Sequence, residues 1–172
     1  MYKKIKEENI YSGKIINVKT ESFEVDNKII KRELVEHKDA VGIFPIDDEG
    51  FVYLVKQYRT PIKDFVIEIP AGLVEDSEDY ENTALRELQE EIGYGAKVFE
   101  KIFQGYNSIG FCTEKTVIYR ASELYVSKLP EDEDEDIEIL KIHFNELKKM
   151  YLQGEIVDFK TAVAILNEIG RR

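Results

Sequence analysis

Residues 72–94 read GLVEDSEDYENTALRELQEEIGY, and this stretch decides the fold of the chain. Ser77 is a suitable N-cap, acidic residues follow it, and Gly93 stands where a left-handed residue ends a helix. The pattern therefore predicts a helix from about Glu78 to Ile92. At about 100° per residue, one face of this helix is apolar. It is formed by Ala84, Leu85, Leu88 and Ile92.

Three carboxylates border that apolar face: Glu87, Glu90 and Glu91. Like charges about 5 Å apart repel by roughly 3 kcal/mol per pair at an effective dielectric of 20. The helix contains no lysine, so Arg86 is the only cation on it. The cluster either takes up protons or holds a divalent cation, and oxygen ligands without His or Cys favour Mg²⁺ or Mn²⁺. Periodicity alone favours an ordinary charged surface helix instead.

Around this helix the chain alternates between strand and helix patterns. The predicted strands are Ile10–Lys19, Ile29–Val35 after a turn at Asp26-Asn27, Val41–Ile46, Phe51–Tyr58, Glu68–Gly72, Lys97–Phe103, Thr116–Ala121 and Ile137–Phe144. Two more helices are predicted, Glu146–Gln153 closed by Gly154 and Asp158–Ile169, with Asn145 and Asp158 as N-caps. This order predicts an α/β/α sandwich with a mixed β-sheet.

Composition limits the class of protein. The chain has 172 residues, 43% of them hydrophobic, which suits one domain with a single core. We expect antiparallel N-terminal strands over about residues 1–38 and the sandwich over about residues 39–172. The net charge of −11 argues against nucleic acid as a partner. No apolar run predicts a signal peptide or membrane span, and the single cysteine, Cys112, predicts a cytoplasmic protein.

The spacing of Gly72, Glu78, Arg86-Glu87-Leu88, Glu90-Glu91 and Gly93 resembles the Nudix box, GX5EX7REUXEEXGU with U an aliphatic residue. Every fixed position matches, and Tyr94 at the final U position is the one departure. The resemblance implies hydrolysis of a nucleoside diphosphate linked to another group, with a Mg²⁺ cofactor or Mn²⁺ as a substitute.

The rest of the chain is similar to the ADP-ribose pyrophosphatase branch of that family. The segments that carry the similarity are Arg32–His37, Gln57–Arg59, Glu68–Gly72, Thr113-Glu114, Glu133–Ile137 and Asp158–Thr161. This implies hydrolysis of ADP-ribose to AMP and ribose 5-phosphate by a homodimer whose N-terminal strands cross between subunits. The branch usually has Ser-Pro-Gly where this chain has Ser108-Ile109-Gly110.

The resemblance also implies roles for individual residues. The metal ligands would be the carbonyl of Ala71 with Glu87, Glu90, Glu91 and Glu135. Catalysis would use Glu133 as the base, with Glu135 as its substitute, together with Glu90 and Arg86. The substrate-binding residues would be Arg32 and Glu33 near the adenosine, Arg59 near the phosphates, Glu68, Gly72, and Glu114 near the terminal ribose.

Several alternatives stay open. The acidic run Glu131–Asp136 is typical of a solvated loop, and a buried structural ion pair would explain Arg32-Glu33 or Arg59 with Glu68 equally well. The substrate could be GDP-mannose, ADP-glucose or a nucleoside triphosphate. Outside catalysis, the chain could be an ADP-ribose sensor or a Ca²⁺-binding module. We interpret the remaining candidates as packing (Cys112), structural or surface groups (His37, His143) and a residue that stacks on a purine (Tyr106).

Overall fold

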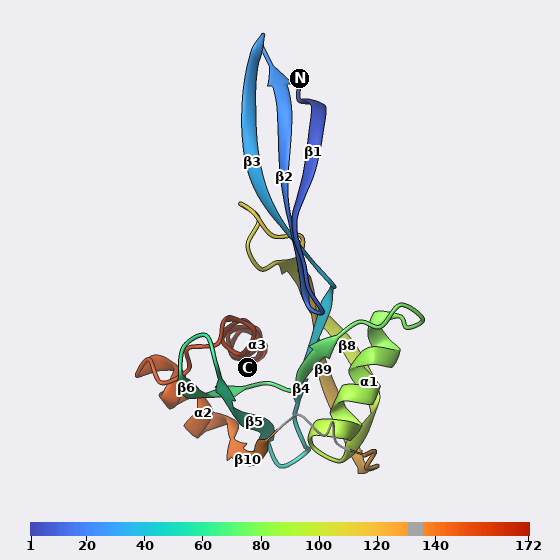
Figure 1. The fold of residues 1–172 in the computed structure, drawn as a ribbon. Coiled ribbons are helices and arrows are strands. Elements are labelled where there is room, and N and C mark those ends of the chain that lie inside the picture. Colours follow the sequence, from blue (N-terminus) through green and yellow to red (C-terminus); the bar gives the residue numbers. More distant parts are fainter. Residues whose placement is uncertain (131–135) are drawn as a thin grey trace. The chain divides into compact units, whose positions relative to one another are not determined.

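The computed structural model describes residues 1–130 and 136–172, which form two compact units. The N-terminal unit contains Met1–Ala40 and Gly105–Thr116. The core unit contains Val41–Gln104 and Val117–Arg172. Both units are drawn in Figure 1.

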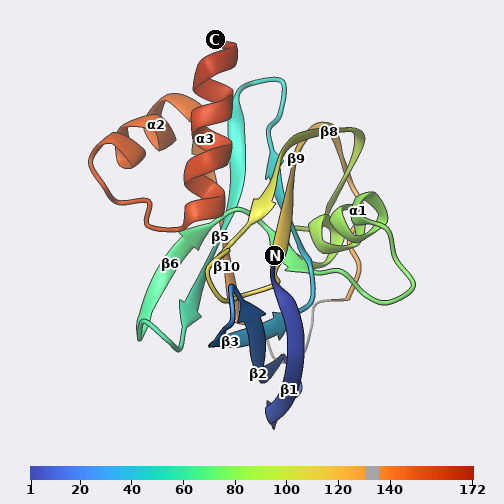
Figure 2. The ribbon, with the colours of Figure 1, turned by 90° about the horizontal axis from the view of Figure 1, so that it is seen from above.

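The N-terminal unit is a three-stranded antiparallel sheet in the order β1 (Lys3–Ser12), β2 (Ile16–Val25), β3 (Lys28–His37). Figure 2 shows these strands from above. The predicted turn is confirmed, because Asp26 and Asn27 have φ values of 51° and 63°, as a tight hairpin requires. The predicted strand Ile10–Lys19 is wrong. The chain turns at Gly13, whose N–H donates to the carbonyl of Ile16 at 2.9 Å, so that segment belongs to two strands.

The strands of the core unit form two ladders. One has the order β10 (Ile137–His143), β5 (Phe51–Arg59), β6 (Asp64–Glu68). The other has the order β7 (Ala71–Leu73), β4 (Ala40–Pro45), β9 (Lys115–Val126), β8 (Tyr94–Tyr106). The predicted strand Glu68–Gly72 is divided between β6 and β7, and Pro70 lies between them.

Helices lie on both sides of these strands, with α1 (Tyr80–Glu91) on one side and α2 (Phe144–Leu152) and α3 (Phe159–Arg171) on the other (Figure 1). Alternate residues of each central strand face opposite sides. In β5, Tyr53 and Val55 pack in the α1 cluster, whereas Val52 and Leu54 pack in the cluster of α2 and α3. The predicted α/β/α sandwich is confirmed. No helix among the described residues is long and apolar enough to cross a membrane.

The helix ends differ from the expectation in two places. Helix α1 is capped by Asp79 rather than Ser77, and its carboxylate accepts the N–H of Asn82 at 2.8 Å. Helix α2 is capped by His143 rather than Asn145, because the imidazole Nδ1 accepts the N–H of Asn145 at 3.2 Å. The predicted cap of α3, Asp158, is confirmed.

Candidate active site

Arg86 lies at the centre of the carboxylate helix. Its Nε and second terminal nitrogen donate to the two carboxylate oxygens of Glu78 at 2.9 and 3.0 Å. Its other terminal nitrogen lies 2.7 Å from Glu90 Oε2 and 2.8 Å from Glu87 Oε1. These pairs raise the pKa of Arg86, with the hydrogen bond to Glu78 as the largest contribution. One guanidinium therefore offsets the repulsion among three carboxylates.

Two of the carboxylates also lie against strand β7. A Cβ atom on Gly72 would stand 1.9 Å from Oε1 of Glu87, so only glycine lets this carboxylate lie against the backbone. The Oε2 atom of Glu91 accepts the N–H of Ala71 at 3.1 Å, and Glu91 is 5% exposed. The sequence predicted that these side chains lie at the half-buried edge of the helix. Glu87 is half-buried there, and Glu91 is buried against β7.

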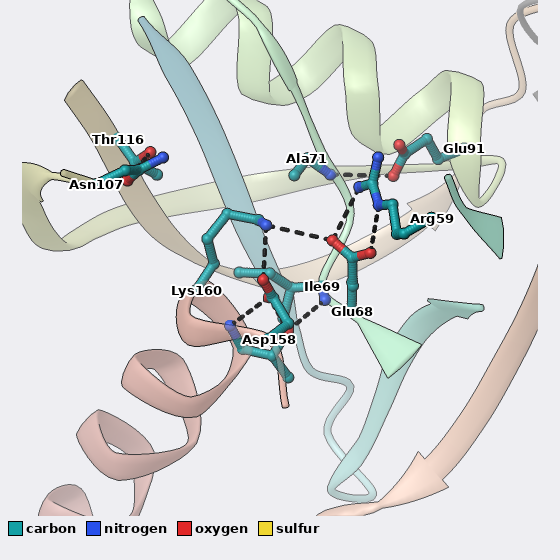
Figure 3. A network of polar contacts seen from close by, with 10 residues as sticks. Arg59, Glu68, Ile69, Ala71, Glu91, Asn107, Thr116, Asp158 and Lys160 are labelled. Atoms are coloured by element: carbon teal, nitrogen blue, oxygen red, sulfur yellow. Dashed lines mark hydrogen bonds and ion pairs between the residues drawn. The ribbon is translucent and has the colours of Figure 1, made fainter. Parts of the chain in front are cut away.

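Arg59 and Glu68 form a bidentate ion pair on strands β5 and β6. Arg59 Nε donates to Oε1 of Glu68 at 2.6 Å, and a terminal nitrogen donates to Oε2 at 2.9 Å. Figure 3 shows the guanidinium between Glu68 and Glu91. The hydrogen bond to Glu68 is the main cause that raises the pKa of Arg59, and the charge of Glu91 adds to it. The side chain of Arg59 is still 41% exposed, so its guanidinium remains accessible to an anion.

The first turn of α3 completes this network. Lys160 Nζ lies 3.2 Å from Oε2 of Glu68 and 2.8 Å from Oδ1 of Asp158. The hydroxyl of Thr161 donates to Asp158 at 2.7 Å and accepts the N–H of Ile69 at 2.8 Å. The cap of α3 is therefore joined to the strand segment that leads to Ala71 (Figure 3).

Comparison with known families agrees with this arrangement of carboxylates. A model of the NUDIX domain matches residues 36–160, which is most of the chain. The chain belongs to the Nudix family. The Nudix box predicted from spacing is thus the loop, β7 and α1 of the core unit.

Relatives of known name resemble this Nudix chain along nearly its whole length. It is 43% identical to the ADP-ribose pyrophosphatase of Bacillus subtilis (strain 168), over 95% of this chain and 90% of that protein. It is 36% identical to the methanol dehydrogenase activator of Bacillus methanolicus, over 95% and 90%. The crystal structure of an ADP compounds hydrolase has the same fold, with a TM-score of 0.83 and 21% identity, over 97% of this chain and 92% of that one.

Nudix hydrolases need a divalent metal, and the donor set of α1 fits one. Glu87, Glu90 and Glu91 supply hard oxygen atoms, and the carboxylate of Glu87 closely approaches the backbone at Gly72, the residue after Ala71. Among the residues that the structure describes, no three His, Cys, Asp or Glu side chains converge to hold a metal ion. The carboxylates bind Arg86 and the N–H of Ala71.

The other predicted substrate-binding residues belong to the N-terminal unit. Arg32 and Glu33 on β3 are exposed, and Arg32 donates to the carbonyl of Lys31 at 3.0 Å. The interpretation of Arg32-Glu33 as a buried ion pair is therefore wrong. Glu114 is half-buried, and its carboxylate lies 4.0 Å from Nδ1 of His37.

A hollow of about 430 Å³ lies within the same unit. It is lined by Tyr106, Ile109, Cys112 and Thr113. Tyr106 is 58% exposed at this hollow, which leaves its ring open to stacking. Cys112 is a half-buried lining residue.

Glu133 and Glu135 lie outside the described residues, so their roles stay predictions. Sequence reasoning missed two other residues. The sequence marks Glu78 only as a position of the box, whereas in the structure it holds Arg86 through both oxygens. Lys160 was given no role. One signal was available, because a lysine in the first turn of a helix opposes the helix dipole and needs another partner.

Proposed function

We propose that this Nudix hydrolase cleaves the pyrophosphate bond of ADP-ribose to give AMP and ribose 5-phosphate, with Mg²⁺ as its cofactor. The observation that carries the proposal is the complete carboxylate set of α1, in which Arg86 pairs with Glu87 and Glu90 and the N–H of Ala71 binds Glu91. The identity with an ADP-ribose pyrophosphatase over 95% of the chain supports the substrate.

The core unit supplies two kinds of group to this reaction. Glu87, Glu90, Glu91 and the carbonyl of Ala71 would hold the divalent cation. When bound, the cation supplies positive charge to the pyrophosphate oxygens and makes a water molecule more acidic. Arg59, held by Glu68, donates hydrogen bonds to a phosphate and keeps the leaving group aligned.

The water molecule needs a base, and we propose Glu133 for it, with Glu135 as its substitute or as a metal ligand. The base takes one proton from the water, whose oxygen then forms a bond to phosphorus. The bond from that phosphorus to the bridging oxygen breaks, and the second phosphate leaves with that oxygen.

We also propose that the enzyme is a cytoplasmic homodimer. No residue of β1, β2 or β3 is buried within one chain. Large apolar side chains stand exposed on the sheet, including Ile5, Ile10, Tyr11 and Ile29. A second copy would cover them, and Arg32, Glu33 and Glu114 would then bind the nucleoside and terminal ribose.

The test is a substrate panel. Purified protein with Mg²⁺ is incubated with ADP-ribose, ADP-glucose, GDP-mannose, NADH, diadenosine polyphosphates and 8-oxo-dGTP, and the products are separated by chromatography. We expect ADP-ribose to have the highest kcat/KM and to give AMP and ribose 5-phosphate.

Two variants of the same helix control this experiment. Glu90→Gln should lower turnover by at least about 100-fold, because it removes a proposed metal ligand. Glu81→Gln makes the same chemical change at an exposed position of α1 and should leave turnover unchanged. A higher kcat/KM for another sugar nucleotide would overturn the substrate, and binding without turnover would favour a sensor.

A further inference from the structure

The carboxylate of Glu68 binds two cations at once. Its Oε2 atom accepts from Arg59 at 2.9 Å and from Lys160 at 3.2 Å, while Oε1 accepts from Arg59 alone at 2.6 Å. Glu68 is 2% exposed, so these contacts replace hydration that the carboxylate has lost. Lys160 therefore takes part in fixing the rotation of the carboxylate plane to which Arg59 is bound.

Lys160 is itself held in place. Asp158 Oδ1 lies 2.8 Å from its ammonium, and Asp158 is fixed in turn because it caps α3 through the N–H of Thr161 at 2.9 Å. Burial disfavours the ammonium ion, but the charges of Asp158 and Glu68 outweigh burial and raise the pKa of Lys160. Two carboxylates and two cations thus form an electrically balanced group.

The exposed end of this group is Arg59. A long side chain that is 41% exposed can adopt several rotamers, and a bidentate partner with a fixed orientation selects one of them. Since Glu68 is oriented by Lys160, a change at Lys160 should reach the guanidinium of Arg59 without direct contact between the two cations.

We infer that Lys160 is a positioning residue, which holds Glu68 so that Arg59 points toward the phosphates of the substrate. This inference rests on the proposed function, because it assigns Arg59 to a phosphate. It adds to the site a residue from α3, 101 positions from Arg59 in the chain.

A double-mutant cycle tests the inference. Lys160→Met removes the ammonium and keeps the length of the side chain. We expect it to lower kcat/KM for ADP-ribose by about 10- to 100-fold, as a small misplacement of a binding group does. In an Arg59→Ala background, Lys160→Met should have no further effect, because Lys160 acts through Arg59. Lys160→Arg should restore most of the activity, since a guanidinium can bind both carboxylates.

The controls separate positioning from stability. Lys149→Met removes an exposed lysine of α2 that pairs only with Glu146 among the contacts of the described residues, and it should change neither kcat/KM nor Tm. Each variant is checked by Tm. The inference is overturned if Lys160→Met lowers kcat/KM by the same factor in the presence and in the absence of Arg59. It is also overturned if Lys160→Met leaves kcat/KM unchanged when Arg59 is present.

The same cycle distinguishes a failure of this inference from a failure of the proposed substrate. If the wild type prefers GDP-mannose, the proposal of ADP-ribose fails, and the cycle is measured with GDP-mannose, where the non-additive result is still expected. A wild type that neither binds nor cleaves any sugar nucleotide overturns both.

Discussion

Arg86 and Gly72 show how single residues build the site. The guanidinium contacts three carboxylates within 2.7–3.0 Å, so the helix tolerates a concentration of negative charge without a lysine. Gly72 acts through the space that its missing Cβ leaves, which the carboxylate of Glu87 fills. The sequence predicted both as members of the box. It could not predict which carboxylates Arg86 would contact, because that depends on the loop that brings Glu78 back to the helix.

Gly72→Ala should separate activity from stability. The added Cβ would lie 1.9 Å from Glu87, but the obstacle is the end of a flexible side chain, which can turn away. We therefore expect a change in Tm of no more than about 2–3 °C, corresponding to under about 1 kcal/mol for a chain of this size. Because Glu87 then leaves its place beside residue 72, kcat/KM should fall by about 100-fold.

A matched control for this variant is Gly170→Ala at the end of α3, where an added Cβ meets no atom within 4 Å. It should leave kcat/KM unchanged, and Tm should stay the same or rise slightly, because alanine is a better helix former than glycine. Full activity of Gly72→Ala with ADP-ribose would contradict the metal-binding role proposed for Glu87.

At the scale of whole elements, α3 couples the stability of a helix to the geometry of the site. Asp158 satisfies the N–H and hydroxyl groups of Thr161, and Thr161 in turn accepts the N–H of Ile69. The sequence predicted this cap correctly, because an aspartate before an apolar periodic run is a strong signal. It predicted the caps of α1 and α2 two residues away from their places, Ser77 for Asp79 and Asn145 for His143, since Ser and Asn are good N-caps by residue type and the tertiary structure selects the residue that caps each helix.

Replacing Asp158 should reveal both of its contributions to stability. Asp158→Ala removes the cap and one of the two carboxylate partners of Lys160, and should lower the free energy of unfolding by about 1–2 kcal/mol. Asp158→Asn keeps a capping oxygen and should cost less at pH 7. Urea unfolding followed by circular dichroism measures both.

The dependence on pH follows from the direction of the pKa shift. Burial disfavours the charged form of Asp158, but the contacts with Lys160 and Thr161 outweigh burial. In the folded protein they lower the pKa of Asp158 below its ordinary value of 3.8. The stabilisation is therefore complete above that value and is lost as the pH falls below it. The stability advantage of the wild type over Asp158→Asn should be constant from pH 7 to about 5 and shrink below about pH 4. An advantage that grows on acidification would contradict this assignment.

The secondary structure of the core unit was easier to predict from the sequence than that of the N-terminal unit. The order of strand and helix patterns predicted a sheet covered on two sides, and β4, β5 and β9 do have buried apolar residues on both faces. The alternation of apolar and polar residues misled the prediction for Ile10–Lys19, because it continues through the turn at Gly13. Division of the core strands into two ladders was not predictable either, since pairing partners are set by contacts distant in sequence.

The net charge of −11 bears on how the molecule responds to cations. Any salt screens the repulsion among the negative charges of the chain. A cation that binds at a specific site stabilises the folded state in addition. If α1 binds Mg²⁺, a concentration of about 100 times Kd stabilises the folded state by about 2.7 kcal/mol. For a chain of this size, Tm should then rise by about 5–10 °C. Differential scanning fluorimetry of EDTA-treated protein measures this rise without any substrate.

Two comparisons test whether the rise in Tm comes from a specific site: MgCl₂ against NaCl, and the wild type against variants of the proposed metal ligands. NaCl at equal ionic strength should give a much smaller rise, because it screens charge without occupying the site. The double variant Glu87→Gln with Glu91→Gln should lose most of the rise caused by Mg²⁺, whereas Glu81→Gln at the exposed end of the same helix should keep it. Equal rises in NaCl and MgCl₂, or an undiminished rise in the double variant, would mean that these carboxylates stabilise the chain only as part of its overall charge. Since the two core clusters consist of apolar side chains, EDTA should abolish turnover while the protein stays folded.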